Sequence, residues 1–148
     1  RKPTLWDNYP VNDGPRMSRF LHLRGFTGRR HTIADHVAGH AINPALQAHL
    51  SLIPAATLVA SYREGDGYAY LSAFRAAARS LAGEPLGAML DEDLHALQDR
   101  GFDALGDSPD DDRARLRARY AAVQNPMAAE VVRWLDGADT VDGWVEDA

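Results

Sequence analysis

Polar and apolar residues alternate over residues 4–9 (TLWDNY), close to the start of the chain. A period of two is typical of a strand and would place Trp6 and Asn8 on the same face. Pro10 lacks the backbone donor that a sheet ladder needs, so the predicted strand stops before it. Residues 33–42 form a short apolar run that fits either a short helix or a short buried strand.

From residue 43 onward the apolar residues recur at helical spacing. The Asn-Pro pairs at 43–44 and 125–126 each combine a preferred N-cap residue with proline at the first helical position. The Ser-Pro pair and three acids at 108–112 predict another start of this kind. Pro54 is expected to kink the first helix. The predicted helices cover residues 44–62, 68–82, 85–100, 109–124 and 126–136, with a last turn near 140–146.

These elements predict a mainly α fold, in which a helical bundle follows a few strand and loop segments. The polar, glycine-containing break at 63–67 (REGDG) predicts a division into residues 1–62 and residues 63–148. The sequence begins Arg-Lys-Pro-Thr, without a methionine or a signal-peptide pattern, and we interpret it as an excerpt of a longer chain.

Composition narrows the class of protein. With 148 residues and 45% hydrophobic content, the chain has about the length of one domain and enough apolar residues for a core. A net charge of −5 argues against nucleic acid or an anionic membrane as the main partner. There is no cysteine, and therefore no disulfide framework or thiolate chemistry.

The segment 5–13 (LWDNYPVND) concentrates hydrogen-bonding side chains at the end of the predicted strand. Trp6 offers a flat apolar wall, Asn8 a donor and an acceptor, and Asp13 a charged acceptor. Sugars require this mixture, because their C–H faces stack on aromatic rings and their hydroxyls pair with Asp and Asn. The alternative is a strand end whose Asn and Asp residues close a turn before Pro and Gly.

Other polar groups have simpler explanations. Asn43 is accounted for as an N-cap before Pro44. His36 and His40, together with Asp35, lack the further ligands and the His-Glu-x-x-His pattern of a zinc site. The acidic clusters at 91–93 and 107–112 do not match a calcium loop. No metal and no cofactor is therefore expected.

Three segments in order carry a family resemblance: WDNYPVND at 6–13, LHLRGFTGR at 21–29, and the long segment from Gly39 to Tyr62 that contains Asn43-Pro44. Together they resemble the C-terminal part of the catalytic domain of family 84 glycoside hydrolases, which includes the O-GlcNAcases. The helices that follow resemble, more weakly, the helical domain after the barrel in that family.

The resemblance implies a (β/α)8 barrel of which this chain holds the last strands, with its site at the carboxyl ends of those strands. It implies that Trp6 walls the sugar subsite and that Asn8, Asp13 and Asn43 bind hydroxyls. Catalysis would be substrate-assisted, through an oxazoline formed by the 2-acetamido oxygen, with an adjacent Asp-Asp pair on an earlier strand. Asp110–Asp112 does not fit that pair, so no catalytic residue is assigned within the chain.

The expected partner is a glycoside or protein that bears β-linked GlcNAc, and a homodimer is compatible with this interpretation. Two alternatives stay open. One is a non-enzymatic helical module for protein interaction or dimerisation, in which 6–13 is only a turn. The other is a complete small hydrolase that uses Asp7 and Asp13, although a proline-containing turn separates the two carboxylates.

Overall fold

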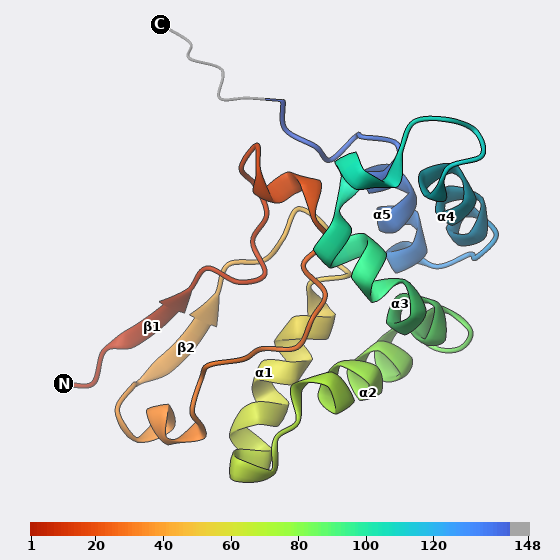
Figure 1. Cartoon of the computed structure of the whole chain (residues 1–148). Helices are drawn as coiled ribbons and strands as arrows, with labels where there is room; N and C mark the ends of the chain where they lie inside the picture. The colour runs from red at the N-terminus through yellow and green to blue at the C-terminus, as the bar shows by residue number, and fades with distance from the viewer. Residues whose placement is uncertain (143–148) are drawn as a thin grey trace, which may run out of the picture.

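A computed structural model describes residues 1–142 as a mainly helical chain with one small sheet (Figure 1). This confirms the predicted fold class. The strands are β1 (Thr4–Asp7) and β2 (Gly39–Ile42). The helices are α1 (Leu52–Glu64), α2 (Tyr70–Ala82), α3 (Leu86–Leu94), α4 (Asp112–Ala121) and α5 (Pro126–Leu135). Short helical turns cover Met17–Arg19, His31–Asp35, Gly65–Gly67 and Phe102–Leu105, and a π-helical turn, His95–Arg100, extends α3.

The two strands pair in parallel, with Thr4 opposite Gly39 and Asp7 opposite Ile42. Parallel strands need a long crossover connection, and here residues 8–38 make it, with two short helical turns. Figure 1 shows the two arrows side by side, with α1 beside β2. The ambiguous run at 33–42 is thus divided between the end of a helical turn and β2.

The helix predicted from Pro44 is wrong over its first eight residues, because α1 begins only at Leu52. Asn43 is therefore not an N-cap. Residues 43–51 form a loop, which Ser51 stabilises by accepting from the amide of Ala45 at 2.9 Å and donating to the carbonyl of Gln47 at 2.8 Å. Pro54 lies in the first turn of α1, where backbone donors have no partner within the helix, so the expected interruption is also wrong.

Most other helix boundaries agree with the sequence patterns. The Asn125 side chain caps α5 by accepting from the amide of Met127 at 2.8 Å. Gly101 ends the helix that began at Leu86, with a φ of 75° that favours glycine. The start of α4 was placed too early, because its N-cap is Asp111 and not Ser108. Residues 140–142 are not helical, and the rest of the last turn predicted near 140–146 lies outside the described residues.

One hydrophobic cluster connects the strand-and-loop segments to the helices. Its largest fully buried side chains include Trp134, Tyr120 and Phe74. The leucines at 21, 23 and 50 join the same cluster. The indole of Trp134 also donates to the carbonyl of Ser18 at 2.9 Å. The division near residues 62–67 stays a prediction, but the apolar core includes residues on both sides of it.

Candidate functional site

The candidate site lies where β1 and β2 end together. The amide of Asn43 donates to the carbonyl of Asp7 at 2.9 Å, directly after the last paired positions. Continuing the same register by one step places Asn8 opposite Asn43. Because the strands are parallel, both carboxamides emerge at the same edge of the sheet. Asn8 is exposed and Asn43 is half-buried.

Trp6 is hydrogen-bonded to one of these two asparagines, Asn8. Its indole nitrogen donates to Oδ1 of Asn8 at 3.0 Å, and 62% of the Trp6 residue is exposed. This bond uses the carbonyl side of the Asn8 amide, which leaves the NH₂ group as a donor. The indole face and a free amide donor therefore lie next to each other, as a sugar-binding surface requires.

Asp13 lies on the loop that follows β1, and it is exposed. Its neighbour Asn12 is fully buried and fixes this loop. The Asn12 amide group donates to the Phe20 carbonyl at 3.0 Å and to Gln47 Oε1 at 2.9 Å, and its Oδ1 accepts from the Leu46 amide at 2.9 Å. The loops after β1 and β2 are thereby joined to each other.

Of the four predicted residues, Trp6 lies in β1, Asn8 and Asp13 lie on the segment after β1, and Asn43 directly follows β2. Trp6 bonds to Asn8, and Asn43 bonds to the backbone of β1. Asp13 makes no direct bond to the other three within the described part of the chain. Its assignment as a sugar contact stays a prediction, as do those of the other three residues.

The sequence analysis missed a second set of residues, the Asp7 cluster, formed by Asp7, Arg29, His40 and Tyr62. Arg29 holds both carboxylate oxygens of Asp7, with Nε 2.5 Å from Oδ2 and Nη2 2.7 Å from Oδ1. His40 Nε2 lies 3.3 Å from Asp7 Oδ2, and its Nδ1 lies 2.6 Å from the Tyr62 hydroxyl. The side chains of Asp7 and His40 are each only 5% exposed.

The hydrogen bond from Arg29 is the main cause that lowers the pKa of Asp7 below its ordinary value, and burial opposes it. A carboxylate with both oxygens bonded to Arg29 is poorly suited to attack a substrate or to transfer protons. The alternative hydrolase that uses Asp7 and Asp13 is therefore disfavoured by the geometry. Because the four members of the Asp7 cluster are far apart in the sequence, no local motif identifies them.

Tyr9 and Gln98 bind the backbone of the segment that contains Leu23 and Arg24. The Tyr9 hydroxyl donates to the carbonyl of Arg24 at 2.6 Å, and burial raises the pKa of Tyr9 to about 12. Gln98 Oε1 accepts from the amides of Leu23 and Arg24 at 2.8 and 2.7 Å. Tyr9 therefore has a structural role, which the sequence analysis left unassigned.

The histidine and acid pattern does not form a metal site. His40 belongs to the Asp7 cluster, and residues 1–142 contain no group of three or more His, Cys, Asp or Glu side chains placed to hold an ion. Within the same residues, no helix is long and apolar enough to cross a membrane.

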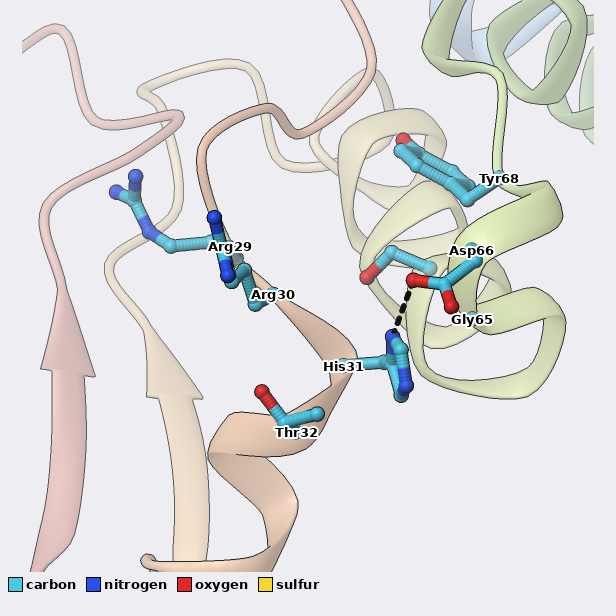
Figure 2. Close-up of a pocket in the computed structure, with 8 residues that line it drawn as sticks. Arg29, Arg30, His31, Thr32, Gly65, Asp66 and Tyr68 are labelled. Atoms are coloured by element: carbon cyan, nitrogen blue, oxygen red, sulfur yellow. Dashed lines mark ion pairs between the residues drawn. The ribbon is translucent and has the colours of Figure 1, made fainter.

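A cavity of about 500 Å³ lies apart from the four predicted residues. Figure 2 shows its lining, where His31 and Asp66 approach to 3.7 Å and the Arg29 guanidinium points away from them. A smaller cavity of about 290 Å³ borders Arg29 on the side of Tyr9 and Gln98. Neither cavity is lined by Trp6, Asn8 or Asn43, the three residues that we call the site rim.

In this chain, two parallel strands that end in hydrogen-bonding side chains are followed by a helical region. Residues 1–99 match the family model described as beta-N-acetylglucosaminidase. The chain therefore belongs to this family, the family 84 glycoside hydrolases.

A solved structure has a fold similar to that of this chain. A mutant of the Thermobaculum terrenum O-GlcNAc hydrolase matches with a TM-score of 0.64 and 24% sequence identity. The match covers 93% of this chain and 35% of that chain. The chain thus spans about a third of the length of the hydrolase that it matches. No curated protein matches this chain.

Proposed function

We propose that this chain supplies the sugar-hydroxyl contacts of a retaining β-N-acetylglucosaminidase that removes terminal β-linked GlcNAc, including O-GlcNAc on proteins. One observation supports this most strongly, in a chain of this family: at the carboxyl ends of two adjacent parallel strands, Trp6 is hydrogen-bonded to Asn8, and Asn43 is hydrogen-bonded to the Asp7 carbonyl between them. In barrel enzymes the residues at these ends form the active site.

The chemical step in this proposal is substrate-assisted. The 2-acetamido oxygen of GlcNAc attacks the anomeric carbon, the bond to the leaving group breaks, and an oxazoline forms. A general acid protonates the leaving oxygen and then, as a base, activates the water that opens the oxazoline. In this proposal these roles belong to an adjacent Asp-Asp pair outside residues 1–148, so these residues alone are expected to be inactive.

The contribution of this chain is binding energy. Trp6 would stack on the sugar ring, while Asn8, Asn43 and Asp13 would bind hydroxyls away from the breaking bond. Such contacts raise the rate when they strengthen as the ring distorts toward the transition state. Asp13 would contribute most, because hydrogen bonds to a charged group are stronger than those between neutral groups.

The test is an assay of the full-length enzyme that contains this chain, with aryl β-GlcNAc and aryl β-GalNAc glycosides. We expect hydrolysis of the GlcNAc substrate and a sharp loss of activity in Asp13→Ala without loss of folding. A full-length protein that lacks an upstream Asp-Asp pair and hydrolyses neither glycoside would instead support the non-enzymatic helical module.

A further inference from the structure

The backbone of Asp7 is linked to all three residues of the site rim, Trp6, Asn8 and Asn43. Asp7 lies between Trp6 and Asn8 in the sequence, and its carbonyl accepts the hydrogen bond from the Asn43 amide at 2.9 Å. A rotation of the Asp7 backbone would therefore move the indole and the first carboxamide together. It would also break the bond that sets the distance to the second carboxamide.

The side chain of Asp7 is fixed from three elements. Arg29, on the segment before β2, holds both carboxylate oxygens, and His40 approaches one of them from within β2. The Tyr62 hydroxyl on α1 fixes the other ring nitrogen of His40 at 2.6 Å. A two-point ion pair restrains orientation as well as distance, and in a buried position its loss leaves an uncompensated charge.

The same geometry separates this role from catalysis. The Asp7 side chain is 5% exposed, whereas the Trp6 residue next to it is 62% exposed. Successive side chains on a strand point to opposite faces, so the Asp7 carboxylate lies on the face away from Trp6 and Asn8. It acts on the substrate only through the residues that it holds.

We propose that Asp7, held by Arg29, is a positioning residue for the sugar-contact residues at the ends of β1 and β2. This inference rests on the proposed function, because it names what orients the same site. A binding site held within about 0.5 Å of its productive geometry needs supporting residues whose own orientation is fixed. The ion pair between Asp7 and Arg29 meets that requirement.

The test is a double-mutant cycle in the full-length enzyme, measured as kcat/KM on an aryl β-GlcNAc glycoside. The single variants are Asp7→Asn and Asn8→Ala. If Asp7 positions Asn8, part of the loss is shared, and the double variant loses at least about threefold less than the product of the two single losses. We also expect Arg29→Lys, which keeps the charge, to retain more activity than Arg29→Ala.

The matched control is Asp93→Asn. Asp93 is also buried and bonded to an arginine, with Arg119 Nη1 2.9 Å from Oδ2, but it belongs to the contact between α3 and α4. The fold losses in kcat/KM of Asp93→Asn and Asn8→Ala should multiply in the double variant, because Asp93 shares no contact with the rim. If Asp7→Asn does not fold, Arg29→Lys takes its place in the cycle.

The outcomes separate the two proposals. The proposed function stands if Asn8→Ala and Asp13→Ala each reduce kcat/KM. The positioning role is rejected if the fold loss of Asp7→Asn, or of Arg29→Lys in its place, simply multiplies with that of Asn8→Ala. Wild-type activity in Asp7→Asn rejects it as well. A full-length wild-type enzyme that is inactive on β-GlcNAc rejects the proposed function and, with it, this inference.

Discussion

Asn8 lies opposite Asn43 in the parallel register, one step beyond the last paired residues of β1 and β2. The hydrogen bond from the Asn43 amide to the Asp7 carbonyl continues the pairing of the two strands up to this position. Two carboxamides from segments 35 positions apart in the register therefore lie at one edge, beside the exposed indole of Trp6. Strand pairing places the side chains of Asn8 and Asn43, so substitutions that shift either strand should measurably change the binding of GlcNAc.

The first prediction concerns the order of the hydroxyl contacts. In the full-length enzyme, Asp13→Ala should lower kcat/KM on an aryl β-GlcNAc glycoside by roughly 10- to 150-fold, as for a hydrogen bond to a charged group. Asn8→Ala and Asn43→Ala should each lower it by about 3- to 10-fold, as for neutral bonds. Asp35→Ala, an exposed acid on the turn His31–Asp35, is the control and should leave the rate unchanged. An Asp13→Ala enzyme with wild-type kinetics contradicts the assignment.

A second prediction separates the two functions of Trp6. Trp6→Ala removes the aromatic wall, so the inhibition constant of free GlcNAc should rise by about 3- to 10-fold. Trp6→Phe keeps a ring and loses only the bond to Asn8, and we expect a smaller rise. The exposed Tyr70 on α2 provides the control, because Tyr70→Ala should not change GlcNAc binding. Equal effects of Phe and Ala at position 6 would exclude stacking.

Much of the helical region could be predicted because its signals are local. The cap at Asn125 and the stop at Gly101 depend on a few neighbouring residues, and the structure confirms both. The Asn-Pro pair at 43–44 gave the same local signal but does not begin a helix. An N-cap contributes about 1 kcal/mol. Here the bonds that Asn12 and Ser51 make to this segment hold it in a loop instead.

The site was only partly predictable for a related reason. The exposed candidates Trp6 and Asn8 share one short motif, so their residue types and spacing indicate a common surface. The Asp7 cluster joins residues 22 to 33 positions apart, and no periodicity connects them. Asp7 and Asp13 are equally acidic in the sequence, and only burial and the ion pair with Arg29 distinguish a supporting residue from an exposed one.

The third prediction separates folding from binding at two neighbouring asparagines. Asn12→Ala removes the three hydrogen bonds of a fully buried side chain and leaves their partners unsatisfied, so the free energy of unfolding should fall by about 2 to 4 kcal/mol. Asn8→Ala, on the exposed rim, should change it by less than about 0.5 kcal/mol. Urea denaturation of the full-length variants measures both. Equal stability losses would mean that Asn12 does not fix the loop.

A fourth prediction tests the contact between α2 and α3. A Cβ at Gly87 would lie 2.7 Å from Arg79 Cα and 2.8 Å from Arg79 N. Backbone atoms cannot move aside cheaply, so Gly87→Ala should destabilise the protein by about 1 to 2 kcal/mol despite the better helix propensity of alanine. Gly67→Ala, with open space around it, is the control and should have little effect. Unchanged or higher stability in Gly87→Ala would show that the helices can separate without loss.

The last prediction uses two buried carboxyls with opposite pKa shifts. Arg29 lowers the pKa of Asp7, so its carboxylate stabilises the fold above the unfolded pKa of about 3.9 and loses this effect as the pH falls through the folded pKa. The stability difference between wild type and Asp7→Asn should therefore be largest above about pH 5 and shrink below about pH 4. Burial raises the pKa of Asp93, so wild type should gain stability relative to Asp93→Asn as the pH falls. Urea denaturation over a pH series measures how the stability difference between wild type and each Asn variant changes with pH. A change of the same sign for both variants would contradict the assignment of Asp7 as a charge held by Arg29.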